Sequence, residues 1–310
     1  MKEMPLKHLF RLVPAWRYRS HMLGGGMFKL DRQFWIVHDQ FMALGYGYFL
    51  DGVFGGQPCA WHSGRIVRKP IPEKCLEKTL HAVFEEYTRR GISCMLNFSA
   101  PDVDTKMLPD KRSNLLLRIL AEHNASAENP HGVIVSSDCL LEYVRDKHPG
   151  LRITASVIKT AFAHPEQKEG PDWYNGLAER FDMVVVRSDR NLSLSYLAQL
   201  EPKEKMEIIL NSECVVKCPM RVQHYQLMQD ISRGNMSAAP AFAGLMERCR
   251  EQKKEKPNIC LTDAQVESIF GLGFRHFKLA GREMDWTSWV KLNSRFLVDQ
   301  DIILKSFQLD

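Results

Sequence analysis

The sequence predicts a single (β/α)8 barrel, an α/β fold in which eight parallel strands alternate with helices around a closed sheet. From residue 46 onward, short apolar or β-branched runs alternate with longer amphipathic runs, which is the pattern of repeated βα units. A length of 310 residues accommodates one such barrel. No glycine-rich dinucleotide-binding motif follows the first predicted strand, which favours a closed barrel over an open doubly wound sheet.

The strands are expected where the short runs lie, and each run ends in polar residues. They cover residues 46–53, 92–98, 132–136, 152–158, 183–187, 206–210, 258–262 and 276–280. The longer runs carry apolar residues at i, i+3 and i+4 and are predicted to be helices. They cover residues 73–90, 111–123, 138–147, 172–180, 194–200, 241–253, 263–272 and 286–307.

Residues 1–45 precede the repeat and are predicted to form an N-terminal extension that packs on a barrel of residues 46–310. The glycines at 24–26 are interpreted as a flexible joint. The extension holds much of the net charge of +5, because residues 1–20 carry five basic side chains and one acidic one. The rest of the chain is near neutral, so its charge does not support nucleic-acid binding, which stays an open alternative.

The expected location is the cytoplasm, because no run reaches the length of a membrane span and no signal-peptide pattern is present. A transit peptide is disfavoured by the prolines and the low serine content of the first residues. The chain has eight cysteines. In a reducing cytosol, clustered cysteines indicate metal ligands or chemistry, and scattered ones indicate packing.

The most informative stretch for function, residues 211–225, follows the sixth predicted strand. Cys214 and Cys218 stand there with three residues between them, a spacing that lets both thiolates face one ion or cluster. Active sites of barrels lie at the carboxyl ends of the strands, where this stretch begins. The pair is therefore a candidate for metal ligation, with two unrelated cysteines as the alternative.

Two ligands do not hold a cluster, so other cysteines are needed. Cys59, in the loop after the first predicted strand, and Cys249, on a predicted helix, are the favoured partners, with Cys260 as a substitute. Cys75, Cys94 and Cys139 are interpreted as packing residues.

Polar residues at the other predicted strand ends complete the candidate site. Lys278 and Arg282, with Arg65 across the mouth, are predicted to bind a carboxylate or phosphate, and salt bridges to loop acids are the alternative. Asn211 is assigned to substrate binding. The candidate catalytic residues are Asp51, Lys159 and His224. Lys159 could act as an amine or as a substrate-binding cation, with a structural ion pair as the alternative. His224 could be a ligand or a proton carrier, and the favoured alternative is a structural residue at the start of a helix.

Three of these stretches together resemble the family historically named collagenase-like peptidases, whose iron-sulfur members hydroxylate ubiquinone precursors and RNA without oxygen. They are residues 55–65, residues 214–225 and residues 273–282, which hold a phenylalanine-lysine-x-x-glycine-arginine element. The resemblance runs in order from about residue 46 to residue 282.

The resemblance implies a barrel that holds a 4Fe-4S cluster on four cysteines. Cys214 and Cys218 match a ligand pair of that family, and Cys59 falls where some members place a ligand. The sequence departs from the family pattern at Leu279 and Ala280, in the position of the remaining ligand, and in the lack of a downstream accessory domain. These departures leave the substrate and the fourth ligand open.

The functional hypothesis is an iron-sulfur-dependent enzyme that modifies a small molecule or a nucleic acid. A cysteine-ligated zinc scaffold is one alternative, because four thiolates suit zinc equally well, and it would act beside a protein partner. A peptidase-like hydrolase is another, although the chain has neither a His-Glu-x-x-His motif nor a nucleophile elbow. Radical chemistry with S-adenosylmethionine is disfavoured, because this cysteine pair does not follow the first strand.

Overall fold

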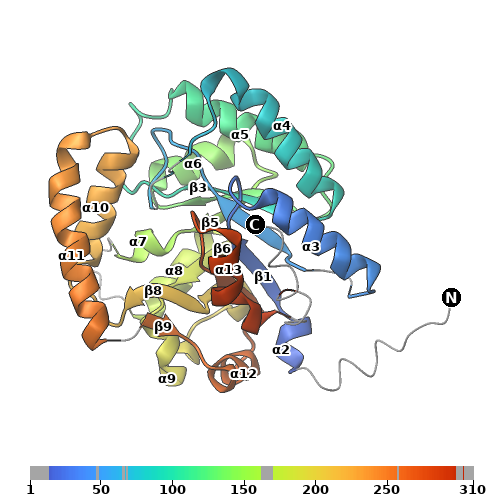
Figure 1. Cartoon of the computed structure of the whole chain (residues 1–310), viewed down its shortest axis with the longest axis vertical. Coiled ribbons are helices and arrows are strands. Elements are labelled where there is room, and N and C mark those ends of the chain that lie inside the picture. The colour runs from blue at the N-terminus through green and yellow to red at the C-terminus, as the bar shows by residue number, and fades with distance from the viewer. Residues whose placement is uncertain are drawn as a thin grey trace.

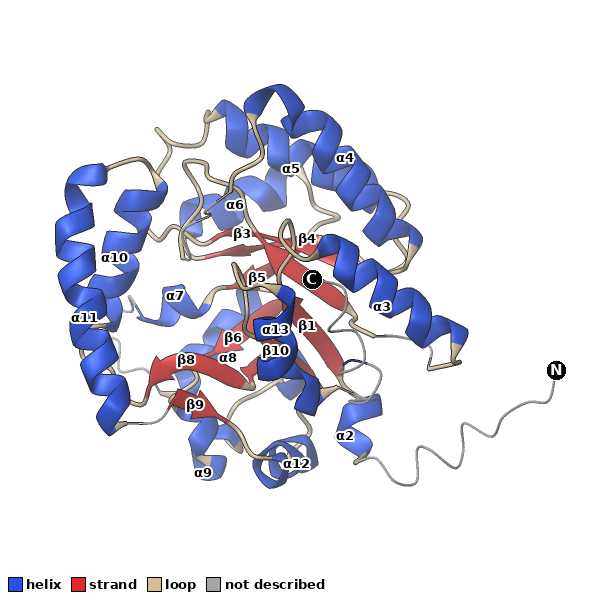
Figure 2. Cartoon of the chain, viewed as in Figure 1, coloured by secondary structure: helices blue, strands red, loops and turns tan. Residues whose placement is uncertain are grey.

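Eight parallel strands close into a barrel in the computed structural model, which confirms the predicted fold class (Figures 1 and 2). The structure describes residues 14–46, 49–64, 67, 69–161, 170–256, 258–297 and 303. The barrel strands are β1 (His21–Gly25), β2 (Gly52–Gly55), β3 (Ser93–Phe98), β4 (Gly132–Val135), β5 (Arg152–Ala155), β6 (Met183–Val186), β7 (Met206–Ile209) and β10 (His276–Leu279). They follow one another in this order, and β10 pairs with β1 to close the sheet.

Helices surround the barrel on the outside, as Figure 2 shows. They are α2 (Ala15–Tyr18), α3 (Asp31–Ala43), α4 (Glu73–Arg89), α5 (Lys111–Asn124), α6 (Asp138–Lys147), α7 (Val157–Ala161), α8 (Pro171–Arg180), α9 (Leu194–Leu197), α10 (Arg221–Ser232), α11 (Ala239–Glu255), α12 (Asp263–Gly271) and α13 (Trp286–Asn293). Short 3-10 turns lie at η1 (Arg190–Leu192), η2 (Lys203–Lys205), η3 (Met236–Ala238) and η4 (Ser294–Phe296). The sequence did not indicate α3 or α10.

Local chemistry explains where several helices begin. The side chains of Asp110, Ser137 and Asp285 accept hydrogen bonds from backbone N–H groups in the first turns of α5, α6 and α13. Thr262 and Gln265 form a reciprocal capping box at the start of α12. These caps satisfy backbone donors that a helix cannot satisfy by itself.

The first barrel strand lies earlier in the chain than the sequence analysis predicted. β1 pairs in parallel with both β2 and β10, so the predicted boundary after residue 45 and the flexible joint at residues 24–26 are wrong. Glycines replace β-branched residues in β1 because neighbouring groups approach closely: a Cβ on Gly24 would lie 2.7 Å from the Leu50 side chain. The Trp289 indole donates a 2.7 Å hydrogen bond to the Gly25 carbonyl, which joins α13 to the end of β1.

The predicted strand at 258–262 is not part of the barrel. Its observed counterpart, β9 (Asn258–Cys260), pairs antiparallel with β8 (Asn211–Val215) in a separate two-stranded sheet. These strands and the helices between them form an insert of residues 211–260 between β7 and α12. The helices α10 and α11 of the insert pack side by side (Figure 1).

The insert is fastened at its base. The Leu261 amide donates to the Leu210 carbonyl at 2.8 Å, and the Leu210 amide donates to the Lys278 carbonyl at 3.0 Å. The Asn211 side chain accepts from the Ala280 amide and donates to Asn293 of α13. Both ends of the insert are therefore held at the carboxyl end of β7.

Within the described part of the chain, no helix is both long and apolar enough to cross a membrane.

The close approach of the chain after β1 to β2 gives a test of the barrel assignment. A Cβ on Gly55 would lie 2.5 Å from the Met27 carbonyl oxygen, a backbone atom that cannot easily move. Gly55→Ala should therefore lower the free energy of unfolding by about 1–3 kcal/mol, measured by urea titration. Gly176→Ala is the control, because that exposed position in α8 has open space around it and should gain about 0.5–1 kcal/mol. Equal stability of the two variants would contradict the assignment of β1.

Candidate active site

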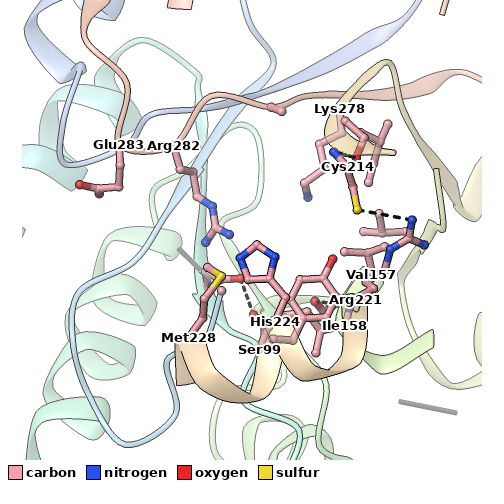
Figure 3. Close-up of a pocket in the computed structure, with 18 of the residues that line it drawn as sticks. Ser99, Val157, Ile158, Cys214, Arg221, His224, Met228, Lys278, Arg282 and Glu283 are labelled. Atoms are coloured by element: carbon pink, nitrogen blue, oxygen red, sulfur yellow. Dashed lines mark hydrogen bonds between the residues drawn. The ribbon is translucent and has the colours of Figure 1, made fainter. Parts of the chain in front are cut away.

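A cavity of about 450 Å³ lies at the carboxyl ends of the barrel strands, where barrels of this kind hold their active sites. Its floor is formed by strand side chains: Phe54, Asn97, Ile134, Val185, Ile209 and Lys278. The insert supplies a wall from α10 and α11: Arg221, His224, Tyr225, Met228, Phe242, Met246, Cys249 and Lys253. Figure 3 shows the side chains of Arg282, His224 and Met228 converging in this space.

The lining combines a large apolar surface with basic groups. Among the described lining residues, the charged ones are Arg221, Lys253, Lys278 and Arg282, together with one acid, Glu283. Burial raises the pKa of Tyr225 to about 12, so its hydroxyl stays protonated at neutral pH. The cavity therefore suits a ligand with an apolar body and a negative charge.

Lys278 is held in the floor by a buried ion pair. Its Nζ lies 2.8 Å from Oε2 of Glu207 on β7 and 4.3 Å from the ring centroid of Phe54. Burial lowers the pKa of Lys278, and the Glu207 charge opposes that shift. Because Glu207 neutralises it, Lys278 adds polarity to the cavity floor rather than a net charge.

Arg282 follows β10 through a turn that depends on glycine. Gly281 has φ +135°, and a Cβ there would lie 2.6 Å from the Trp289 ring. Across the mouth, a Cβ on Gly64 would lie 2.7 Å from Nη2 of Arg282. The two glycines leave room for the guanidinium, which Figure 3 shows directed toward the His224 ring.

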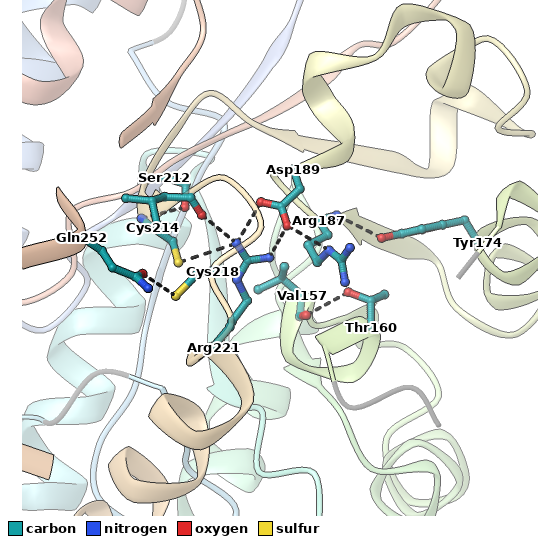
Figure 4. A network of polar contacts seen from close by, with 11 residues as sticks. Val157, Thr160, Tyr174, Arg187, Asp189, Ser212, Cys214, Cys218, Arg221 and Gln252 are labelled. Carbon is teal, nitrogen blue, oxygen red and sulfur yellow. Dashed lines mark hydrogen bonds and ion pairs between the residues drawn. The ribbon is translucent and has the colours of Figure 1, made fainter. Parts of the chain in front are cut away.

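The cysteine pair lies at the tip of β8, next to a buried arginine (Figure 4). Nη2 of Arg221 donates to the Cys214 sulfur at 3.6 Å, while its guanidinium makes a two-point ion pair with Asp189 at 2.7 and 2.8 Å. Although burial opposes the charged form, Asp189 and Cys214 together raise the pKa of Arg221. The arginine therefore stays protonated beside Cys214, with its charge balanced by Asp189.

The four predicted metal ligands are not brought together. Cys249 lines the same cavity as Cys214, but Cys59 is buried beside Ser113 of α5, and burial raises the pKa of its thiol to about 11. Cys260, the substitute, is exposed on β9. Among the described residues, no three histidine, cysteine, aspartate or glutamate side chains are placed to hold a metal ion. The four-cysteine set does not fit a cluster in this arrangement.

Two of the predicted catalytic residues lie away from the cavity. Asp51 precedes β2 and is at the amino ends of the strands, where its carboxylate bonds to the His21 ring at 3.0 Å and the Met22 amide at 2.6 Å. The prediction failed because β2 begins one residue after Asp51. Lys159 lies on α7 and pairs with Asp138 at 2.9 Å, the structural ion pair that was its alternative.

The remaining predicted residues differ in whether they line the cavity. His224 lines the cavity and stays a candidate proton carrier. Asn211 is buried, is engaged with Ala280 and Asn293 and does not line the cavity, and its assignment to substrate binding stays a prediction. Arg65 lies outside the described residues. Of the three predicted packing cysteines, Cys94 is buried, Cys139 is half-buried, and Cys75 is exposed, so the interpretation is wrong for Cys75.

Sequence reasoning missed Glu207 as the partner of Lys278, Phe54 in the cavity floor, and Asp189 beside the cysteine pair. Glu207 carried a usable signal, because a charged residue inside an otherwise apolar strand needs a buried partner. Phe54 carried none, because an aromatic residue in a strand is most often a core residue.

Comparison with known proteins supports the fold alone. No family model matches the chain, and no curated protein matches it. Its structure is similar to that of the U32 peptidase Mk0906, with a TM-score of 0.55 at 13% identity over 86% of this chain and 94% of that one. U32 peptidases are the collagenase-like family, so the fold agrees with the resemblance in the sequence. A xylose isomerase-like TIM barrel/4-hydroxyphenylpyruvate dioxygenase fusion protein aligns over 86% of this chain and 39% of that one, with 12% identity and a TM-score of 0.28, which carries no argument.

The buried pair in the floor predicts an unequal response to substitution. Glu207→Met removes the acid that faces both Lys278 and Arg152, whereas Lys278→Met leaves Glu207 near the Arg152 charge. Glu207→Met should cost about 3–5 kcal/mol of unfolding free energy and Lys278→Met less. The double variant should recover part of the loss, because no lysine is then left unpaired. Urea unfolding of the three variants measures this order, and the reverse order would contradict the geometry.

Proposed function

We propose that this barrel is an enzyme whose substrate is a small organic anion with an apolar body, bound in the cavity between the strand ends and the insert. The observation that carries this proposal is the composition of the cavity: a largely apolar lining with basic groups at its edge. A volume of about 450 Å³ lies within the range of sites for small organic molecules. Enclosure by α10 and α11 favours a small ligand over a macromolecule.

Arg282 is the residue that we assign to the anionic group. Its guanidinium lies in the cavity 5.5 Å from the Phe54 ring centroid, so an aromatic or aliphatic body could rest on the apolar floor while the charge meets the arginine. Arginine can bind a carboxylate or phosphate through two parallel hydrogen bonds. His224 lies on the facing wall and is the group that we assign to proton transfer.

The iron-sulfur-dependent hydroxylation implied by the resemblance stays a prediction for this chain. Because the four proposed ligands do not converge in the described residues, we derive no step through a cluster. The zinc scaffold and the peptidase-like hydrolase stay alternatives, and no observation favours either.

A pair of fluorescent probes tests the proposed ligand class. 1-Anilinonaphthalene-8-sulfonate carries an apolar ring system and one negative charge, and N-phenyl-1-naphthylamine has the same rings without the charge. Arg282→Gln should weaken binding of the sulfonate by about 10- to 100-fold, the effect of losing a charge-assisted hydrogen bond, and leave the neutral probe unchanged. Fluorescence titration gives both dissociation constants.

Two further variants locate the probes and control for charge. Met246→Trp places a larger side chain on the α11 side of the cavity and should weaken the binding of both probes. Arg250→Gln removes a charge from the exposed face of α11 and should leave both dissociation constants unchanged. If the sulfonate binds Arg282→Gln as well as it binds the unmodified protein, the assigned anion site is wrong.

A further inference from the structure

Cys214 and Cys218 are placed as two adjacent thiols with unequal surroundings. Cys214 lines the cavity, whereas the Cys218 sulfur faces away to Gln252 of α11, at 3.7 Å from its amide oxygen. A tight turn returns the chain between them, with Lys217 in the left-handed region at φ +50°. The two side chains lie within hydrogen-bonding reach of each other.

The charges around the pair distinguish the two thiols. The Arg221 guanidinium contacts the Cys214 sulfur at 3.6 Å, and a neighbouring cation stabilises a thiolate. Burial and the neighbouring Cys214 both raise the pKa of Cys218. Cys214 is therefore the sulfur on the side open to the cavity and in contact with the guanidinium, and Cys218 lies behind it.

Asp189 keeps Arg221 in place. Its two oxygens accept hydrogen bonds from both terminal nitrogens of the guanidinium, one of which, Nη2, also contacts Cys214, and both side chains are buried. The hydrogen bonds from Arg221 lower the pKa of Asp189 against the effect of its burial. An arginine fixed in this way can face a thiolate without moving as the sulfur changes its charge.

We infer that Cys214 and Cys218 form a redox-active dithiol that reduces a small anionic disulfide entering the cavity. This inference rests on the proposed function, because the same apolar and basic lining would select the disulfide. The Cys214 thiolate attacks one sulfur of the ligand, which forms a mixed disulfide and releases the first thiolate. Cys218 then loses its proton and attacks Cys214, which releases the second thiolate and leaves a Cys214–Cys218 disulfide. Two protein thiols are oxidised and one ligand disulfide is reduced.

The test uses 5,5′-dithiobis(2-nitrobenzoate), an aromatic disulfide with two carboxylates, on the full chain with Cys75, Cys139 and Cys260 replaced by serine. Those three are the remaining cysteines that are not buried. The parent protein should release about two equivalents of thionitrobenzoate and retain no adduct, as intact mass spectrometry would show by a loss of two hydrogens. Cys218→Ala should release about one equivalent and retain one adduct.

Matched variants assign the roles. Cys94→Ala should behave as the parent does, because this buried cysteine of β3 does not line the cavity. Cys214→Ala should abolish the fast phase of the reaction. The inference is overturned if the parent protein retains the adduct, or if Cys214→Ala leaves the release of thionitrobenzoate unchanged. It is also overturned if the thiols react only after a chelator has removed bound metal.

A neutral disulfide separates this inference from the proposed function. 4,4′-Dithiodipyridine carries no charge, so Arg282→Gln should slow the reaction with the dicarboxylate and not with the dipyridine. If both disulfides react with Cys214 and Cys218 at rates that Arg282→Gln leaves unchanged, the redox-active dithiol is supported and the assignment of Arg282 to the anion is wrong. If neither disulfide reacts with Cys214 and Cys218 while binding of the sulfonate probe still depends on Arg282, the anion site is supported and the redox-active dithiol is wrong.

Discussion

The parallel pairing of β7 with β10 is the constraint on which the rest of the structure depends. Two parallel neighbours require a connection that leaves at the carboxyl end of one strand and returns at the amino end of the next. α12 makes that return, so residues 211–260 must leave and rejoin the chain at the carboxyl end of β7, where Leu210 and Leu261 are joined by a hydrogen bond. The insert therefore stands over the barrel mouth and becomes a wall of the cavity.

The same pairing organises the charges of the site. Because β7 and β10 are neighbours, Glu207 and Lys278 meet inside the barrel and neutralise each other. The charges at the mouth come instead from chain that follows these strands: Arg282 after β10, and Arg221 on the insert. Asp189, after β6, neutralises the second of these and fixes its position beside Cys214. The cavity thus has an apolar body, a basic edge and a thiol pair at one corner.

The sequence was most informative where strands are buried on both sides. Runs such as Met183–Val186 are continuous apolar stretches, and a parallel sheet requires them. The strand β1 was not predicted, because its glycines allow close packing but have a low propensity for β structure. The strand β9 was mistaken for a barrel strand, because a short apolar run does not indicate which strand it pairs with. The proximity of Cys214 and Cys218 followed from local spacing. The positions of Cys59, Asp51 and Asn211 relative to the cavity depend on contacts between distant parts of the chain, which no local sequence pattern indicates.

The central claim is that the space between the strand ends and the insert is a ligand site for an apolar anion. A crystal structure of the protein with bound 1-anilinonaphthalene-8-sulfonate tests it most directly. The account predicts density for the rings over Phe54, enclosed by Met228 and Phe242, with the sulfonate beside Arg282. Probe density only on the outer surface, with the mouth of the barrel filled by protein side chains, would contradict it.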